Sequence, residues 1–216
     1  MDFITRMYTT KCNTPGDINE HLPVLEQYAS ECSTVAELGV SKICSTWALL
    51  HGLMRSEASS KKLYCVDIEK IFMGFVIEQA NLVGINLQFI HENSATVNFD
   101  TEVDMLFIDT WHVYGHLKRE LEHHHSNVKK YIILHDTEND AVFGETIRFW
   151  ADFYNENGSR GLKSFIQREC EKSGYTPCEV SKGLQPAITE FLDRHSEWVV
   201  HEVYTNNNGL TILKRK

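Results

Sequence analysis

The sequence lacks any apolar run long enough to cross a bilayer, and its first residues, MDFITRMYTTKC, lack the hydrophobic centre of a signal peptide. It also lacks an excess of basic residues, since 21 Lys and Arg stand against 30 Asp and Glu, a formal net charge of −9. A dominant nucleic-acid or anionic-membrane surface needs clustered Lys and Arg. We therefore expect a soluble, cytoplasmic protein that binds neither nucleic acid nor membrane.

The six cysteines lack the close C-x-x-C spacing of a zinc site, and several lie in apolar runs that resemble strands. This pattern is typical of reduced thiols in the cytosol. Linkers, internal repeats and low-complexity tracts are also missing. With 216 residues, the chain is long enough for one α/β domain and has little room for a second core. We expect a single domain over residues 1–216, with residues 1–30 as a helical lead-in and one helix within residues 14–30.

Residues 104–137 contain two short apolar runs that each end in an acid, Asp109 and Asp136. The segment between the runs has apolar residues at roughly helical spacing, up to and including Val128, which predicts strand, crossover helix and strand. In a parallel sheet both acids emerge at the same edge, and open α/β sheets bind ligands beyond that edge. Because His112 and His135 accompany the acids, the sequence predicts a functional site there.

Two earlier strands are predicted to deliver further polar residues to this edge. Residues 34–40 form a β-branched and apolar run that carries Glu37 and stops at Gly39 before a helix-like segment. Strand, glycine turn and helix is the form of a nucleotide-binding first unit, in which glycine lets the backbone approach a ligand. The next strand, residues 62–68, carries Asp67 near its end, where a carboxylate can accept two hydrogen bonds from a ribose diol.

The third predicted strand, residues 85–90, is followed by Asn93 and Ser94. Polar side chains at this strand end are candidates to reach an adenine edge. Taken alone, a capped helix start at either residue is an equally good interpretation.

Three histidines in a row, His123-His124-His125, follow in the crossover segment. Consecutive side chains of a helix diverge by ~100° each, so three such rings do not converge on one ion. We predict that this run forms a solvated helix face.

The remaining elements are predicted to cover and close the sheet. Helical patterns over residues 143–154, 161–174 and 184–197 predict cover helices. At the end, residues 198–204 and 210–215 read as strands that flank a turn rich in Asn and Gly. Since Asn and Gly tolerate positive φ, this pattern predicts an antiparallel hairpin beside the parallel strands.

Five parallel strands that alternate with helices and end in a hairpin resemble the class I S-adenosylmethionine (SAM) methyltransferases. The resemblance implies a Rossmann-like, doubly wound α/β fold, with a mostly parallel seven-stranded sheet and helices on both faces. More narrowly, the motifs E-L-G, D-T-W-H-V-Y and Y-I-I-L-H-D-T resemble the small metal-dependent O-methyltransferases grouped with macrocin O-methyltransferase and the cephalosporin hydroxylase family. The first loop departs from that group, because it reads S-K-I-C-S where the family usually has a second glycine.

The resemblance implies a role for each matching residue. Residues 34–137 would be the SAM- and metal-binding core, and residues 138–216 the cover helices and closing hairpin. The implied cofactor-binding residues are Glu37, Gly39, Ser45, Asp67, Asn93, Ser94 and Asp109. Asp109 and Asp136 would bind a divalent cation, Mg²⁺ before Mn²⁺, with His135 either a further ligand or only a neighbour. His112 would be the general base.

The resemblance implies a SAM-dependent O-methyltransferase, and we expect its acceptor to be a sugar hydroxyl, free or within a glycan or glycosylated natural product. Trp111, Tyr114 and His116, next to the expected base, predict a polar-aromatic wall for the acceptor. A catechol-type or other small-molecule acceptor is the alternative, because catechols offer the same paired oxygens. Two other functions stay open: an NAD-dependent oxidoreductase, although the first loop lacks the G-x-G-x-x-G motif of that class, and a non-enzymatic adenosine-binding module. Two alternatives to a single independent chain also stay open: a homo-oligomer, and a domain of a longer glycan-modifying protein.

Overall fold

The computed structural model describes residues 2–153 and 158–216, and its sheet has seven strands in the order β3-β2-β1-β4-β5-β7-β6. β1 to β5 run parallel, whereas β7 pairs antiparallel with β5 on one side and β6 on the other. The strands are β1 (Thr34–Leu38), β2 (Lys61–Asp67), β3 (Ile85–His91), β4 (Val103–Ile108), β5 (Val128–His135), β6 (Trp198–Tyr204) and β7 (Leu210–Arg215). This arrangement confirms the predicted Rossmann-like sheet and its closing hairpin.

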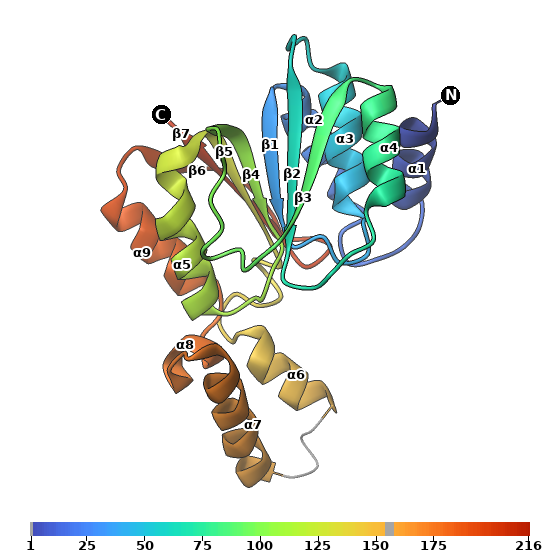
Figure 1. The fold of residues 1–216 in the computed structure, drawn as a ribbon. Helices are drawn as coiled ribbons and strands as arrows, with labels where there is room; N and C mark the ends of the chain where they lie inside the picture. The colour runs from blue at the N-terminus through green and yellow to red at the C-terminus, as the bar shows by residue number, and fades with distance from the viewer. Residues whose placement is uncertain (1, 154–157) are drawn as a thin grey trace.

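Helices cover both faces of the sheet (Figure 1). One face carries α1 (Phe3–Cys12), α2 (Leu22–Ser30), α3 (Ser45–Arg55) and α4 (Gly74–Leu82). The other face carries α5 (Tyr114–His124), which the 3-10 turn η1 (His125–Asn127) joins to β5, and α9 (Gln185–Arg194). A separate group of helices stands beyond one edge of the sheet: α6 (Glu145–Phe153), α7 (Gly158–Ser173) and α8 (Pro177–Ser181).

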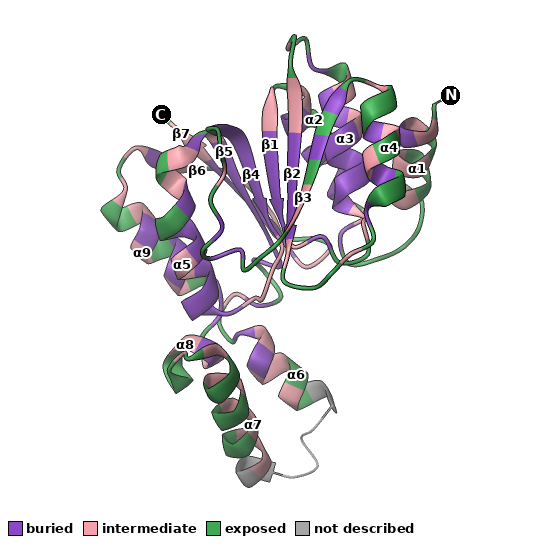
Figure 2. Ribbon diagram, in the orientation of Figure 1, coloured by how far each residue is buried: buried purple, intermediate pink, exposed green. Residues whose placement is uncertain are grey.

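Each face of the sheet has its own hydrophobic core, because successive side chains of a strand point to opposite faces. Along β4, Met105 and Phe107 belong to the core under α2 and α3, whereas Leu106 and Ile108 belong to the core under α5 and α9. Every residue of β4 is buried, as expected for a parallel strand that is covered on both faces (Figure 2). No side chain within β4 is exposed to solvent, so the polar group that this strand contributes to a site is Asp109, directly after its end.

The helical lead-in differs from the prediction. The helix predicted within residues 14–30 is confirmed as α2, but the structure has an additional helix before it, α1, which residues 13–21 separate from α2. α1 begins where the carboxylate of Asp2 accepts the backbone N–H of Thr5 at 2.8 Å. Among the residues of α1, Ile4 alone is buried, so the apolar face is too narrow to give a helical signal in the sequence.

Later elements differ mainly at their boundaries. The spacing of apolar residues predicts that Val128 belongs to the crossover helix, but in the structure Val128 is the first residue of β5. The predicted helix over residues 143–154 is confirmed as α6 up to Phe153, and Tyr154 lies outside the described residues. Within residues 2–153 and 158–216, none of the helices has both the length and the apolar character needed to cross a membrane. All six cysteines lie in this described part of the chain and are free thiols.

Of the three consecutive histidines His123 to His125, His123 alone is exposed, so the predicted solvated face is only partly confirmed. His124 is buried, with its ring stacked near Phe99 and its Nε2 2.7 Å from the backbone carbonyl oxygen of Ser94. His123 places its Nε2 2.8 Å from the carbonyl oxygen of Val97. The last turn of α5 therefore packs against the segment after β3, a contact that no local pattern reveals.

The close approach of two strand ends depends on Gly39, directly after β1. Its φ is +88°, and a Cβ built there would lie 1.9 Å from the backbone carbonyl oxygen of Asp109. The N–H of Gly39 donates to the carbonyl of Val66 at 2.9 Å, and the N–H of Asp109 donates to the carbonyl of Leu38 at 2.8 Å. These bonds extend the pairing of β1 with β2 and β4 to the very ends of the strands.

We expect Gly39→Ala to lower the free energy of unfolding by about 3 kcal/mol or more, because the new methyl group meets fixed backbone and the left-handed φ is strained. Gly84→Ala is the matched control, since Gly84 also has a positive φ, +74°, but no atom lies within 4 Å of a built Cβ. That variant should lose about 1 kcal/mol. Urea unfolding followed by circular dichroism measures both, and equal losses would contradict the steric role of Gly39.

Candidate functional site

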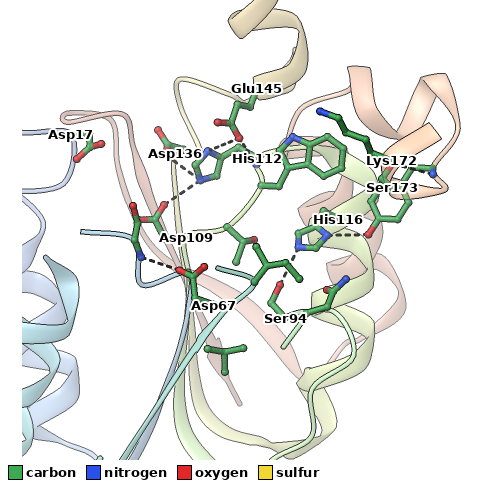
Figure 3. A pocket seen from close by; sticks show the side chains of 18 residues that line it. Asp17, Asp67, Ser94, Asp109, His112, His116, Asp136, Glu145, Lys172 and Ser173 are labelled. Atoms are coloured by element: carbon green, nitrogen blue, oxygen red, sulfur yellow. Dashed lines mark hydrogen bonds and ion pairs between the residues drawn. The ribbon is translucent and has the colours of Figure 1, made fainter. Parts of the chain in front are cut away.

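A cavity of about 640 Å³ lies at the edge of the sheet where the parallel strands end (Figure 3). Most of the predicted site residues line it: Gly39, Asp67, Asn93, Ser94, Asp109, His112 and Asp136. Ser45 lines a smaller cavity of about 260 Å³ that shares Gly39 and Asp109 with the first. Glu37 and His135 lie behind these walls. The fold thus brings together residues that the sequence places at the ends of five different strands.

Asp67, at the end of β2, holds in place the first loop, which is residues 39–44 between β1 and α3. Its Oδ2 accepts the backbone N–H groups of Val40 and Ser41 at 2.9 and 3.0 Å, and its Oδ1 accepts that of Glu69 at 2.8 Å. Ser41 has a φ of +42°, which is strained for a residue other than glycine, so these bonds stabilise a turn that costs energy. A carboxylate has about four acceptor positions, so Oδ1 keeps capacity for one further donor.

Glu37 lies beneath this loop and outside the cavity wall. Its Oε1 accepts a hydrogen bond from Ser45 Oγ at 2.5 Å, and its Oε2 accepts one from Thr46 Oγ1 at 2.8 Å. Burial raises the pKa of Glu37 to about 7, although the hydrogen bonds from Ser45 and Thr46 act in the opposite direction. The hydroxyl of Ser45 is thus committed to Glu37, and the pair fixes the start of α3 below the loop.

Asn93 and Ser94, after β3, differ in what they offer the cavity. Asn93 is exposed, and its Oδ1 accepts the N–H of Ala95 at 2.9 Å, so its side-chain amide N–H groups remain at the surface. Ser94 is buried, with its Oγ 3.0 Å from His116 Nε2. The other ring nitrogen of His116 lies 2.9 Å from the hydroxyl of Tyr175. Ser94 therefore belongs to a hydrogen-bonded chain that orients His116.

One side of the cavity is aromatic. The rings of Trp111 and Tyr175 stack with their centroids 5.8 Å apart and an interplanar angle of 18°. Of the three residues expected in this wall, Trp111 and His116 line the cavity, but Tyr114 turns its hydroxyl to Glu190 at 2.9 and 3.0 Å. Tyr175 takes its place. It precedes α8, far along the chain, so no pattern around Trp111 could have indicated it.

Asp109 and Asp136 both approach the same ring nitrogen of His112 (Figure 3). Nε2 of His112 is 3.1 Å from Asp109 Oδ1 and 3.2 Å from Asp136 Oδ2. Its Nδ1 is 3.5 Å from a carboxylate oxygen of Asp140 and 3.6 Å from one of Glu145. Among the described residues this buried Nδ1 has no hydrogen-bond partner of good geometry. The ring is thus surrounded by carboxylates.

His135, the last residue of β5, reaches the same two acids from behind. Its Nδ1 is 3.1 Å from Asp109 Oδ1 and 3.2 Å from Asp136 Oδ2. Its Nε2 is 3.2 Å from the carbonyl oxygen of Asp17 and 3.3 Å from that of Asn207. Because carbonyl oxygens only accept, Nε2 must carry a proton and Nδ1 is the atom presented to the carboxylates.

The two imidazoles and the two carboxylates shift one another's pKa. Burial alone would lower the pKa of His112, but the hydrogen bond to Asp109 and the charges of Asp136 and Asp109 outweigh it and raise that pKa to about 9. The same balance raises the pKa of His135 to about 10. For the acids burial acts upward, but the histidines hold the pKa of Asp109 and of Asp136 below the usual range. At neutral pH both carboxylates are therefore charged and both imidazoles protonated.

The donor set also fits a divalent cation. One ligand atom each from Asp109, His112 and Asp136 lies within 4.8 Å of the others. Oδ1 of Asp136 is buried and has no hydrogen-bond partner in the described part of the chain, so it has unused acceptor capacity. Asp136 also has a φ of +57°, a strain that proteins often keep at functional sites. The carboxylate oxygens suit Mg²⁺ or Mn²⁺, and an imidazole nitrogen beside them favours Mn²⁺ over Mg²⁺.

Asp140 and Glu145 belong to this cluster, and the sequence reasoning missed both. Asp140 is fully buried and holds Arg148 through two hydrogen bonds of 2.8 and 2.9 Å. Glu145, the first residue of α6, accepts the backbone N–H of His112 at 3.2 Å. The acid-rich run H-D-T-E-N-D after β5 was a readable signal for Asp140, but Glu145 had none.

No protein-family model matches the chain, and no curated protein matches it either. Solved structures do. The O-methyltransferase from Bacillus cereus in complex with S-adenosylhomocysteine (SAH) is 13% identical with a TM-score of 0.55, over 99% of this chain and 90% of that chain. The N-methyltransferase NodS from Bradyrhizobium japonicum WM9 is 11% identical with a TM-score of 0.53, over 91% of this chain and 93% of that chain.

A third match, 1,6-didemethyltoxoflavin-N1-methyltransferase from Burkholderia thailandensis, is 9% identical with a TM-score of 0.56, over 93% of this chain and 79% of that chain. These matches include enzymes named for transfer to oxygen and to nitrogen. Because the sequence identities are so low, these matches establish only the fold of this chain. The acceptor has to be inferred from the residues of the cavity. The expectation from the sequence is confirmed at this level: the chain has the Rossmann-like fold of the class I SAM-dependent methyltransferases.

Proposed function

We propose that this protein is a SAM-dependent O-methyltransferase that methylates a hydroxyl of a sugar, free or within a glycan or glycosylated natural product, with a divalent cation and a histidine base. The observation that carries the proposal is one continuous cavity. It runs from Asp67, suited to a ribose, to the cluster of Asp109, His112 and Asp136, suited to a cation and to proton transfer. The shared fold of SAM-dependent methyltransferases supports the choice of cofactor.

The cofactor side is supported by the strand ends. Gly39 lines the cavity where the end of β1 packs directly against the backbone of Asp109, and Asp67 Oδ1 keeps an acceptor position for a ribose hydroxyl. The exposed amide of Asn93 suits an adenine edge. In this proposal Glu37 and Ser45 act on the cofactor indirectly, because they fix the loop from below.

The transfer itself is an in-line displacement. The acceptor oxygen forms a bond to the methyl carbon while the bond from that carbon to sulfur breaks, and the electron pair stays on sulfur to give SAH. The acceptor hydroxyl must lose its proton, which a sugar hydroxyl releases in water only at very high pH. His112 is the group we assign to receive it, because its ring lies in the cavity wall beside Asp109.

Asp109 and Asp136 would hold the cation, with His135 Nδ1 turned toward the same oxygens. A bound divalent cation supplies Lewis-acid stabilisation of negative charge on the acceptor oxygen, and its own charge lowers the pKa of neighbouring His112. This second effect matters because an imidazole with a pKa of about 9 is protonated at neutral pH and cannot act as a base. Mg²⁺ is the first choice for carboxylate ligands, and Mn²⁺ tolerates imidazole better.

A sugar acceptor is favoured by two features of the cavity. Vicinal hydroxyls can present two oxygens to the region between Asp109 and His112 at once. The stacked rings of Trp111 and Tyr175 offer an apolar surface to the face of a sugar, and His116 adds a polar group beside them. Catechols share the paired oxygens and remain the alternative acceptor class.

We expect SAM and SAH to bind with micromolar affinity, about −8 kcal/mol, and Asp67→Ala to weaken both by about 10- to 100-fold. The reason is the loss of a charged acceptor for the ribose. Calorimetric titration measures both ligands, and Asp193→Ala, which removes an exposed acid from α9, should leave both affinities unchanged. Since Asp67 also holds the first loop, urea unfolding is measured in parallel. Wild-type affinities in a folded Asp67→Ala protein would show that the ribose assignment is wrong.

Chelation of divalent cations should abolish turnover and leave SAM bound, because the cation contacts the acceptor side of the cavity. Asp109→Asn and Asp136→Asn should likewise abolish turnover and leave SAM bound.

His112→Ala should lower kcat by about 10²- to 10⁴-fold with little change in SAM affinity, the pattern of a group used in the transition state. His201→Ala, which removes an exposed histidine of β6, is the control and should keep full activity.

Two results would contradict this mechanism. Full turnover in chelator, without Mg²⁺ or Mn²⁺, would remove the cation from it. An unchanged kcat for His112→Ala across the pH range would remove the base.

The acceptor class is tested by offering labelled SAM with deoxysugar-bearing glycans, catechols, small RNAs and peptides, and by identifying the labelled product by mass. We expect transfer to a sugar hydroxyl. Trp111→Ala should raise the KM for that acceptor more than the Kd for SAM, because the stacked ring faces the acceptor side. Transfer to catechols or RNA, and to no glycan, would overturn the sugar assignment while leaving the methyltransferase assignment intact.

A further inference from the structure

A second group of possible metal ligands lies at the far end of α5 from the cavity. Glu122 is near the end of α5, His125 opens η1, and His195 directly follows α9. One ligand atom from each of the three lies within 4.8 Å of the others. The helices that end at or next to these residues, α5 and α9, lie side by side on the same face of the sheet (Figure 1).

The two histidines face one another in a compact arrangement. Their ring centroids are 3.9 Å apart, and Nε2 of His195 lies 3.1 Å from Oε2 of Glu122. Nδ1 of His125 is buried and has no hydrogen-bond partner among the described residues. The nearest acid to that nitrogen is Glu197, whose Oε1 is 3.6 Å from it and 3.8 Å from Nδ1 of His195. A buried ring nitrogen beside a second imidazole and two acids has the surroundings of a metal ligand.

Neighbouring side chains hold these groups in their orientation. Arg194 donates to Oε1 of Glu122 at 2.9 Å, which leaves Oε2 directed at His195. The ring of Phe191 packs behind both imidazoles, with centroid distances of 5.6 and 4.7 Å. Such outer contacts fix the direction of metal ligands in known sites.

Two arginines lie next to the cluster. Arg194 pairs with Glu122 at 2.9 Å, and Arg215 donates to the backbone carbonyl of His125 at 2.7 Å. Burial lowers the pKa of His125, and the charges of His195 and Arg215 act in the same direction, whereas Glu197 and Glu122 oppose them.

We propose that Glu122, His125 and His195 bind a zinc ion and leave its fourth position to solvent. Two imidazoles with a carboxylate suit a four-coordinate transition metal such as Zn²⁺ better than Mg²⁺, which prefers oxygen ligands alone. Tetrahedral bonds of ~2.0–2.2 Å place ligand atoms ~3.3–3.6 Å apart, so small side-chain rotations close the present arrangement around an ion. The ion would tie the end of α5 and the start of η1 to the residue that follows α9. This site is separate from the cavity and does not depend on the proposed methyl transfer.

The test is a titration of metal-free protein with Zn²⁺ in excess Mg²⁺, read by competition with a chromophoric chelator and by the melting temperature. We expect wild-type protein to bind one Zn²⁺ at this site and to melt at a higher temperature with Zn²⁺, because the ion binds only the folded chain. His195→Ala and Glu122→Gln should each weaken this binding by about tenfold or more and remove the melting shift. Using both variants keeps the test valid if one of them fails to fold.

Two controls separate this site from others. The double variant Asp109→Asn and Asp136→Asn removes the acids of the cavity and should keep the Zn²⁺ bound at the α5–α9 site. His201→Ala, which removes an exposed histidine from β6, should bind Zn²⁺ as the wild type does. Wild-type Zn²⁺ affinity in His195→Ala and Glu122→Gln, loss of all Zn²⁺ binding in the cavity variant, or no binding by the wild type would each overturn the proposal.

Discussion

The site depends on one electrostatic arrangement, in which two carboxylates share two imidazoles. Asp109 and Asp136 follow neighbouring parallel strands, and both are largely buried, so two bare anions there would repel each other and one would take up a proton. His112 from the front and His135 from behind each approach both acids within 3.1 to 3.2 Å. Both acids can therefore stay charged at the strand ends, which is the state that a cation or a reacting acceptor requires.

Segments from the two ends of the chain hold this arrangement from behind. Nε2 of His135 meets the carbonyl oxygens of Asp17 and Asn207, which belong to the lead-in and to the hairpin turn. His21 binds the same turn, with its Nε2 2.9 Å from the carbonyl oxygen of Asn206 and 3.1 Å from that of Asn207. The closing hairpin therefore does more than cover an edge of the sheet, because a carbonyl of its turn accepts the N–H at Nε2 of His135 and so orients that ring.

The two sides of the cavity have different origins. The side that we assign to the cofactor consists of strand ends, whose positions follow from the parallel register of the sheet. The side that we assign to the acceptor is completed by Glu145 of α6 and by Tyr175 before α8, which belong to the helical group beyond the sheet. That group is attached through backbone contacts, such as the N–H of Tyr114 donating to the carbonyl of Lys182 at 2.8 Å. A rigid sheet with a separate acceptor wall explains how this fold serves different acceptors.

The strands, their polar ends and the hairpin follow from local sequence patterns, because apolar periodicity, turn glycines and Asn-rich turns act over a few residues. Most of the predicted site residues meet at one cavity for that reason: Gly39, Asp67, Asn93, Ser94, Asp109, His112 and Asp136. Long-range packing places β7 between β5 and β6, Glu37 under the loop, and Tyr175 on Trp111. It alone brought His125 beside His195. These contacts join residues far apart in the chain, and their geometry follows from the packing of whole helices on the sheet, which no local pattern encodes.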